Sequence, residues 1–461
     1  MRRVGIPRLV VAGVSSGVGK TTIAVGLIAA LRARGLKVAA FKCGPDYLDP
    51  TYHGRVAEAP SQNLDGWMMG RDAVIATFCS ASRGADLAII EGMMGLFDGA
   101  SATGEEGSSA EIAKWLNAPV LLALDSSGIA RSVAAIAHGF RRFDPEVWTA
   151  GLVCNYIGGR GHLELLRAAT TPFPIVGGFP RRTEIAFPER HLGLLAATQD
   201  EIPDASLEAW GKLAEEWFDL NSILEIAHSA PPIMTSDSAG AVSQDQKRCR
   251  IGIAFDEAFH FYYEDNLRRL ESLGAELIRF APTRDRALAP IDGLYFGGGY
   301  PECVAEKLSR NHTMLDEVRA FAASGGPIYA ECGGLMYLSK GIRTLDSKSY
   351  PMVGLIPGEA VMSDRLQALG YVEVETRAPS ILGPAGIHFR GHQFRYSNLE
   401  PPPSNVETVY AMRSRLSGAE MVEGYRVNNL LASYVHAHWA SNPLVAQGFV
   451  DSCAAHAKRM R

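Results

Sequence analysis

Short apolar runs alternate with helical patterns through the first half of the chain. The run from Leu9 to Val11 leads into a glycine-rich loop, and a helical apolar pattern follows this loop until Gly35 stops it. Further strand-like runs lie at 37–42, 86–90, 120–124, 150–155 and 175–179, and helical patterns at 111–116, 127–143 and 162–169. Strands and helices that alternate at these lengths predict a parallel sheet with helices on both faces.

The alternation begins again after a stretch of different composition. Residues 228–248 are rich in Ser, Ala, Pro, Asp and Gln and show little apolar periodicity, which is typical of a linker. A strand opens the segment RIGIAFDEAF, and we predict further strands at 276–280 and 327–330 and helices at 262–273 and 335–340. The pattern therefore predicts an α/β protein with two parallel-sheet domains, at 1–227 and 249–461.

Composition narrows the classes of protein that the chain can represent. The net charge of −5 argues against a general nucleic-acid binder. The seven cysteines are scattered without CxxC pairs, which fits neither a disulfide framework nor a zinc site and favours a reducing cytoplasm. No uninterrupted apolar run reaches the roughly 18 residues of a membrane helix, so we expect no membrane insertion.

The loop after the first strand has the residues that a phosphate site needs. Glycines let backbone N–H groups approach phosphates, a lysine at the helix start reaches the β- and γ-phosphates, and a following threonine hydroxyl can ligate Mg²⁺. The spacing here is G-x5-G-K-T, because Val14 stands where the usual pattern has its first glycine. We predict a nucleotide site formed by Gly13, Gly17, Gly19, Lys20, Thr21 and Thr22.

Acidic residues follow the next two strands, at the edge where α/β sheets bind ligands. Asp46, Tyr47 and Asp49 lie in the loop CGPDYLDP, where the two carboxylates either hold Mg²⁺, steer a substrate or form a Pro/Asp turn. Glu91 ends the third strand, where a second Mg²⁺ contact is expected, and Asp98 follows in a glycine-flanked loop.

Two more polar positions in the first half have a functional and a structural interpretation. Asn155 at a strand end either contacts the nucleotide base or caps a loop. The segment PERHLGL places Glu189, Arg190 and His191 just before a short predicted helix, where they either contact a ligand or begin a surface helix.

One cysteine in the second half stands where a nucleophile is expected. Cys332 lies between a predicted strand and a predicted helix, with Ala330 and Gly334 two positions to either side, which meets the steric requirement of a nucleophile elbow. We expect the helix N-terminus to lower the pKa of this thiol, and the loop 297–299 to supply N–H groups for an oxyanion. A buried, inert cysteine is the alternative.

A cysteine nucleophile needs a base. An apolar strand ends at His436, and His438 follows on the same face if the strand continues, so spacing alone does not choose between them. The intervening segment HFRGHQFRYS either binds an anionic substrate or forms a solvated loop, because it concentrates His388, Arg390, His392 and Arg395.

These segments together resemble one known family. In chain order they are GVSSGVGKT, FKCGPDYLDP, EGMMGLFDG, PERHLGL, FGGGYPE, AECGGLMYL, GHQFRYS and SYVHAHW. They are similar to those of the cobyrinate or hydrogenobyrinate a,c-diamide synthases of cobalamin biosynthesis. The resemblance implies an amino-terminal P-loop domain, similar to dethiobiotin synthetase, that binds ATP and activates corrin carboxylates. It also implies a carboxy-terminal class I glutamine amidotransferase domain that releases ammonia from glutamine.

The resemblance also implies roles for individual residues. Cys332 becomes the thiol nucleophile and His436 its base, and ATP and Mg²⁺ become the cofactors, with Lys20 and Thr21 on the phosphates. The implied metal ligands are Thr21, Asp49 and Glu91, and the implied substrate residues are Asp46, Tyr47, Asp49, Asp98, Glu189 and His191.

The chain departs from the family pattern at two places. Many class I amidotransferases have Glu two residues after the histidine, where this chain has His438, so we name a Cys-His pair without a third member. The segment GHQFRYS has Gln393 and Arg395 where the family has a GHEFHYS-like sequence.

The expected function is that of a cytoplasmic, ATP- and glutamine-dependent amidoligase. Its expected partners are a corrinoid tetrapyrrole, L-glutamine and ATP, with no nucleic acid and no membrane, and a homodimer is compatible with the sequence. Two alternatives stay open. One is a,c-diamidation of nickel sirohydrochlorin, and the other is a partner-regulated P-loop ATPase, which Cys332 and the absence of lysine between Gly13 and Gly19 disfavour.

Overall fold

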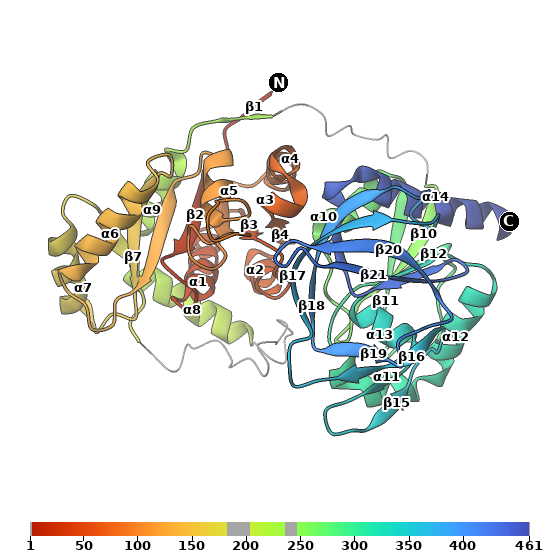
Figure 1. Cartoon of the computed structure of the whole chain (residues 1–461). Helices are drawn as coiled ribbons and strands as arrows, with labels where there is room; N and C mark the ends of the chain where they lie inside the picture. The colour runs from red at the N-terminus through yellow and green to blue at the C-terminus, as the bar shows by residue number, and fades with distance from the viewer. Residues whose placement is uncertain (1, 182–202, 236–246, 461) are drawn as a thin grey trace. The chain divides into compact units, whose positions relative to one another are not determined.

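The computed structural model describes residues 2–181, 203–235 and 247–460. The chain divides into two compact units, Met1–Ala239 and Gly240–Arg461, which Figure 1 shows in red to yellow-green and in green to blue. Among the described helices, none combines the length and the apolar composition needed to cross a lipid bilayer.

Unit 1 is built on a parallel sheet of seven strands in the order β4-β3-β5-β2-β6-β7-β8. The two central strands β5 and β2 are completely buried, as their apolar runs predict. The strands in chain order are β2 Arg8–Gly13, β3 Val38–Cys43, β4 Gln62–Leu64, β5 Leu87–Glu91, β6 Val120–Asp125, β7 Thr149–Asn155 and β8 Ile175–Gly177.

Helices pack against this sheet, and the first of them, α1 Lys20–Ala33, contacts β2, β3 and β5. The helix predicted at 127–143 is shorter than expected: α6 begins at Ser132, because Gly128 has a φ of 70° and interrupts the right-handed helical path. The other helices of unit 1 are α2 Asp49–Ala57, α3 Gly66–Met69, α4 Arg71–Ala81, α5 Ser109–Trp115, α7 Arg160–Thr170, α8 Asp204–Trp217 and α9 Leu220–His228.

Part of the predicted linker has regular structure. Strand β9, Ile233–Thr235, pairs antiparallel with β1, Arg2–Val4. The buried side chain of Arg8 donates hydrogen bonds to the carbonyl oxygens of Leu116 (2.6 Å) and Pro231, so it ties this stretch to unit 1. The strand partner lies more than two hundred residues away in sequence, which is why local composition did not indicate this pairing.

Unit 2 contains a mixed sheet of ten strands in the order β11-β10-β12-β13-β22-β21-β20-β17-β18-β23. Its parallel part comprises β10 Cys249–Ala254, β11 Ala275–Phe280, β12 Gly293–Phe296, β13 Ile328–Glu331 and β22 Leu430–Ser433. The sequence pattern did not reveal the antiparallel part, which comprises β17 Ala368–Thr376, β18 His388–Arg395, β20 Glu407–Ser414, β21 Glu420–Val427 and β23 His436–His438.

A smaller sheet of four strands accompanies it, with β14 Ser339–Arg343, β15 Ser349–Pro351, β16 Ile356–Met362 and β19 Ser397–Glu400. The helix predicted at 335–340 is α13 Gly333–Leu338, which ends where β14 begins. The remaining helices are α10 Glu264–Ser272, α11 Ala305–Arg310, α12 His312–Ala323, α14 Pro443–Met460 and the 3-10 turns η3 Pro301–Val304 and η4 Trp439–Ser441.

Candidate functional site

The loop between β2 and α1 has a backbone that only glycine accommodates at three positions. Gly17 and Gly19 have φ values of 80° and 88°, in the left-handed region that favours glycine. A Cβ on Gly13 would lie 2.7 Å from Cγ2 of Val18, whereas one on Gly17 would meet nothing within 4 Å. The loop therefore folds tightly on its inner side and presents an open backbone at Gly17.

Lys20 begins α1 and places its ammonium group inside this loop. Nζ donates to the carbonyl oxygens of Ser15 (3.0 Å) and Met94 (2.6 Å), which are both neutral acceptors. Burial and the charge of Lys42 lower the pKa of Lys20. A cation whose two hydrogen bonds go to backbone carbonyls, at the end of an open glycine loop, suits an anionic phosphate.

A buried network of charges lies next to the loop and is centred on Glu91. Its Oε1 accepts from the Thr21 hydroxyl (2.7 Å) and from Lys42 Nζ (2.9 Å), and its Oε2 lies 2.6 Å from His53 Nε2. Lys42 Nζ also lies 2.7 Å from Oδ2 of Asp49. No sequence motif marks Lys42 or His53 as part of this network, although a lysine near the end of an apolar strand is an unusual core residue.

Electrostatics keep Glu91 and Lys42 ionised, whereas burial and the charge of Asp46 raise the pKa of Asp49. Burial alone would raise the pKa of Glu91, but Lys42 and His53 hold it well below its ordinary value. Burial would likewise lower the pKa of Lys42, yet Asp49 and Glu91 raise it above its ordinary value. Such a group of buried opposite charges is stable only while every member is present.

Of the three predicted metal ligands, Thr21 and Glu91 lie in contact, whereas Asp49 is bonded to Lys42. Thr21 Oγ1 and Glu91 Oε1 are 2.7 Å apart, while the ammonium group of Lys42 lies between Glu91 and Asp49 and bonds both. Within the described residues, no group of three or more His, Cys, Asp or Glu side chains is arranged to hold a metal ion. Mg²⁺ in nucleotide sites takes one or two protein oxygens and completes its shell with water and phosphate, so the Thr21–Glu91 oxygen pair fits it.

The predicted substrate residues lie on two loops next to the network. Asp46 Oδ1 accepts from the backbone N–H groups of Leu48 (2.7 Å) and Asp49 (3.0 Å), so it forms the turn that starts α2. Tyr47 is buried beside it, and exposed Asp98 accepts from the Gly95 N–H at 2.8 Å. Glu189 and His191, together with Arg190, lie outside the described residues.

Asn155 ends β7 and supports the phosphate loop. Its Nδ2 donates to the carbonyl oxygen of Val18 at 2.9 Å, and a Cβ on Gly19 would lie 2.2 Å from the same nitrogen. Its buried Oδ1 has no hydrogen-bond partner among the described residues. The structure thus supplies the contacts of a loop cap, and a contact of Asn155 with the nucleotide base stays a prediction.

Cys332 occupies a strained turn between β13 and α13. Its φ of 46° and ψ of −101° are conformations that non-glycine residues rarely adopt, at a cost of about 1–3 kcal/mol. The turn is held because the Cys332 N–H donates to the carbonyl oxygen of Ser433 at 2.7 Å. A Cβ on Gly334 would lie 2.5 Å from the Phe296 oxygen, so the expected small neighbour is required. This is the backbone geometry of a nucleophile elbow.

The expectation of a lowered thiol pKa is wrong. Burial and the nearby carboxylate of Glu302 raise the pKa of Cys332 to about 12. Helix α13 has only six residues, and its N-terminus does not overcome the loss of solvent. The thiol therefore needs a base that removes its proton as it reacts.

The glycine loop after β12 has fewer available N–H groups than expected. The Gly297 N–H donates to the Tyr262 hydroxyl (2.8 Å), and the Gly298 N–H donates to the Phe261 oxygen (3.2 Å). The Gly299 nitrogen, by contrast, lies 3.0 Å from the position of a Cβ on Gly333, the residue after the cysteine. Gly299 is therefore the residue of this loop whose backbone approaches the turn after Cys332 most closely.

The structure separates the two candidate histidines. His436 begins β23 rather than ending an earlier strand, and a Cβ on Gly298 would lie 2.4 Å from its Cε1. His438 instead accepts from the Ala440 N–H at 3.4 Å and packs on the Tyr263 ring, with 4.5 Å between the ring centroids. Burial lowers the pKa of His436 to about 3 and that of His438 to about 4, so both rings are neutral at pH 7. Of the two histidines, His436 therefore lies against the loop 297–299. The same loop also lies against Gly333, the residue that follows Cys332.

Two residues that no sequence motif predicted, Glu331 and Asn266, hold the strand of His436 in place. Glu331 accepts from the Tyr329 hydroxyl (2.9 Å), the Tyr295 hydroxyl (3.1 Å) and the Ala437 N–H (3.1 Å), and burial raises its pKa to about 8. Asn266 donates to the Ala437 oxygen at 2.8 Å and accepts from the Trp439 N–H at 2.9 Å. An acid directly before the cysteine, at the end of an apolar run, was the available signal for Glu331.

The positive segment 388–395 forms neither a solvated loop nor one basic patch. It is strand β18, so successive side chains point to opposite faces. His388 is exposed, Arg390 lies 3.5 Å from Glu373, and buried His392 bonds the Tyr263 hydroxyl at 2.9 Å.

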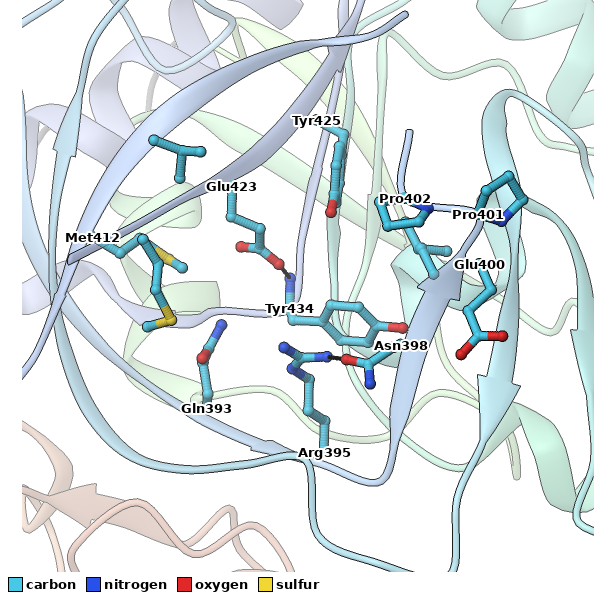
Figure 2. Close-up of a pocket in the computed structure, with 13 residues that line it drawn as sticks. Gln393, Arg395, Asn398, Glu400, Pro401, Pro402, Met412, Glu423, Tyr425 and Tyr434 are labelled. Carbon is cyan, nitrogen blue, oxygen red and sulfur yellow. Dashed lines mark hydrogen bonds between the residues drawn. The ribbon is translucent and has the colours of Figure 1, made fainter. Parts of the chain in front are cut away.

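The last residue of this strand, Arg395, lines a cavity of ≈ 780 Å³. Figure 2 shows its guanidinium beneath the Tyr434 ring, 4.4 Å from the ring centroid, and the Glu423 carboxylate bonded to the Tyr434 N–H. The remaining lining residues named in the figure are Gln393, Asn398, Glu400, Pro401, Pro402, Met412 and Tyr425.

Comparison with known families matches both units. Residues 9–194 match the model of the CobQ/CobB/MinD/ParA nucleotide binding domain, and residues 250–444 match the CobB/CobQ-like glutamine amidotransferase domain. The first unit is therefore a nucleotide-binding domain and the second a glutamine amidotransferase domain.

Curated relatives match over nearly the whole length. The cobyrinate a,c-diamide synthase of Leptospira interrogans is 54% identical over 97% of this chain and 98% of its own. Enzymes of the same name from Syntrophotalea carbinolica and Priestia megaterium are 47% and 41% identical, over 97% and 98% of this chain and 98% of their own chains. The chain belongs to the cobyrinate a,c-diamide synthase family.

Proposed function

We propose that this chain uses ATP and glutamine to amidate the a and c side-chain carboxylates of cobyrinate or hydrogenobyrinate in cobalamin biosynthesis. The observation that carries the proposal is the presence, in one chain of this family, of a phosphate loop and of an elbow cysteine. A carboxylate is a poor electrophile, so amidation needs both an activating phosphoryl donor and a source of ammonia.

Cys332 and His436 perform the glutaminase half of this proposal. The neutral His436 imidazole takes the thiol proton as sulfur attacks the amide carbon of glutamine. The C–N bond then breaks, the leaving nitrogen receives that proton, and ammonia departs. Water attacks the resulting thioester, which releases glutamate and restores the thiol. We assign stabilisation of the oxyanion to the N–H of Gly299, since its nitrogen lies beside Gly333.

The phosphate loop performs the ligase half. An oxygen of the corrin carboxylate attacks the γ-phosphorus of ATP, ADP leaves, and an acyl phosphate forms. Ammonia then attacks the acyl carbon and phosphate leaves, which gives the amide. Lys20 stabilises the transferred charge, because its ammonium group begins α1 beside the phosphate loop and donates to backbone carbonyl oxygens rather than to a carboxylate.

Thr21 and Glu91 would hold Mg²⁺ in this site, through the hydroxyl and carboxylate oxygens that lie 2.7 Å apart. When bound, Mg²⁺ neutralises charge on the phosphate oxygens. Lys42 keeps the Glu91 carboxylate ionised and therefore competent as an oxygen ligand. Asp46, Asp49 and Asp98, on the neighbouring loops, complete the proposed surroundings of the substrate.

A reducing, cytoplasmic setting is part of the proposal. None of the seven cysteines, all within the described residues, forms a disulfide. Such a setting keeps the Cys332 thiol reduced, as its proposed role requires.

The test supplies the purified protein with ATP, Mg²⁺, glutamine and one tetrapyrrole at a time. We expect cobyrinate or hydrogenobyrinate to gain two amide groups by mass, each of which replaces a hydroxyl by an amino group. Amidation of nickel sirohydrochlorin alone would transfer the assignment to that substrate. ATP hydrolysis that depends on no tetrapyrrole would overturn the ligase mechanism.

A further inference from the structure

The mechanism above requires His436 to become positively charged inside the protein. The ring takes the thiol proton as sulfur attacks, yet burial lowers the pKa of His436 to about 3. The protonated ring is therefore costly where it forms, and a general base must also be correctly placed before the proton arrives. The position two residues further on, where many class I amidotransferases have a glutamate, is His438, a second ring that burial keeps neutral.

His392 lies directly against the ring of His436. The two residues are opposite one another in the antiparallel pairing of β18 with β23. Their ring centroids are 4.9 Å apart and their ring planes differ by 18°, which is a stacked arrangement. The residue before His392 is glycine, and a Cβ on Gly391 would lie 2.4 Å from the carbonyl oxygen of His436. Glycine at this position therefore permits the close approach of the two strands that brings the rings together.

The His392 ring is itself fixed in place. Its Nδ1 forms a hydrogen bond of 2.9 Å with the hydroxyl of Tyr263, a buried residue that directly precedes α10. The Tyr263 ring also packs on His438, with 4.5 Å between the ring centroids. Burial and the neighbouring rings of His436 and His438 lower the pKa of His392 well below its ordinary value. His392 is therefore a neutral aromatic ring that is held rigidly against the base.

A neutral ring in this position has two effects on the base. A cation that lies over an aromatic face is attracted to it, and the attraction is stronger where water is excluded, as it is here. The stack also limits rotation of the His436 side chain, so that the base is already oriented when the thiol reacts. Both effects act on the charged ring that forms during the reaction and need no carboxylate beside it.

We propose that His392 is a positioning residue for the general base: its ring fixes the plane of His436 and stabilises the imidazolium that forms when the Cys332 proton is transferred. His392 itself gains no proton, and His436 passes the proton on to the leaving nitrogen. The third member of the site then comes from β18 rather than from the position two residues after the base. This inference rests on the proposed glutaminase function.

The test measures kcat and KM for the release of glutamate from glutamine. His392→Ala should lower kcat about 10- to 100-fold and change KM less than about twofold, because the loss falls on the transition state. His392→Phe keeps an aromatic face and should lose less activity than His392→Gln, which keeps a hydrogen-bonding group but has no ring. His388→Ala, at an exposed histidine of the same strand, is the matched control and should keep the wild-type values.

A double variant separates positioning from a structural role. If His392 acts through His436, then His392→Ala should cause no further loss of kcat in the His436→Ala background. Losses that multiply in the double variant would overturn the inference, and so would a His392→Gln enzyme that is faster than His392→Phe.

A second route does not depend on the folding of the His392 variants. Tyr263→Phe removes only the hydroxyl that bonds His392, and it should lower kcat about three- to tenfold, as expected for the loss of one hydrogen bond. This loss should disappear in the His436→Ala background. A loss of the same size in both backgrounds would contradict the proposed role of His392.

Failure of the proposed function gives a different result. A wild-type enzyme that releases no glutamate from glutamine has no glutaminase activity, and the role proposed for Cys332 is then wrong before any variant is compared. A wild-type enzyme that hydrolyses glutamine, but whose variants at His392 and His436 lose rate independently, keeps the proposed function and refutes only the role of His392.

Discussion

The turn after β2 and the turn after β13 both join a buried strand to a helix, but the buried groups beside the first turn are charged and the histidine beside the second is neutral. Each follows a buried parallel strand, precedes a helix and contains a residue with positive φ, 88° at Gly19 and 46° at Cys332. Beside the first turn, Glu91 and Lys42 are buried as ions that stabilise one another. Beside the second, burial keeps the His436 ring neutral by lowering its pKa to about 3.

The difference matches two kinds of chemistry. Phosphoryl transfer depends on fixed charges that face the phosphates before the reaction begins. Thiol chemistry depends on a proton that moves between neutral groups during the reaction. In the proposed function, similar strand-to-helix turns carry different reactions because their buried neighbours differ, which is how one architecture supports unrelated functions.

The largest expected effect is the complete loss of one nitrogen source while the other is kept. Cys332→Ala should abolish glutamine-dependent amidation and spare amidation with ammonium chloride, because no ATP contact is proposed for the thiol. Product formation with each nitrogen source is the measurement. Cys303→Ala, at an exposed cysteine, is the control and should behave as wild type. Retained activity with glutamine would remove Cys332 from the mechanism.

The reciprocal change is Lys20→Ala. It should lower amidation with either nitrogen source about a thousandfold, because it removes a preorganised charge from the transferred phosphoryl group. Glutamine hydrolysis should change little. The exposed lysine variant Lys37→Ala serves as the control. Near-normal amidation by Lys20→Ala would disprove the assignment of the loop.

The ion network gives the third prediction. Lys42→Met should lower the free energy of unfolding of unit 1 by about 3–5 kcal/mol at pH 7, because Glu91 and Asp49 lose the cation that both contact. Urea unfolding at several pH values measures this loss.

The pH dependence of that loss has a definite sign. Lys42 lowers the pKa of Glu91, so its contribution to stability exists above the ordinary pKa of a glutamate and disappears as the pH falls. The deficit of the variant should therefore shrink toward acid pH. A deficit that stays constant with pH would mean that lost packing, rather than lost charge, causes it.

The smallest expected effect is the difference in rate between variants of the two neighbouring histidines, His436 and His438. His436→Ala should lower glutamine hydrolysis by roughly a hundredfold or more, as expected for loss of a general base. His438→Ala should affect the rate much less and thermal stability more, since that ring packs on Tyr263 and accepts from the Ala440 N–H. Rates and melting temperatures of both variants decide the order, and the reverse order would assign the base to His438.

Local sequence determined much of this protein. The buried strands of unit 1 and the glycine loop could be predicted, because apolar runs of strand length and glycines at tight turns have few other structural solutions. The elbow at Cys332 could be predicted for the same reason, since Gly334 leaves space where any larger side chain would meet Phe296. The family membership followed from the same short segments and is confirmed by relatives that match along the whole chain.

Only the tertiary structure decided what surrounds these segments. Lys42 and Glu91 form an ion pair although they are 49 residues apart in the chain. Glu331 accepts a hydrogen bond from the N–H of Ala437, which lies 106 residues further along the chain. Burial at such contacts reversed the expected direction of the Cys332 pKa, and the pairing of β18 with β23 placed His392 against His436 rather than in a basic loop. The physical reason is that charge state depends on desolvation and on neighbours in space, and a single sequence specifies neither until the strands have paired.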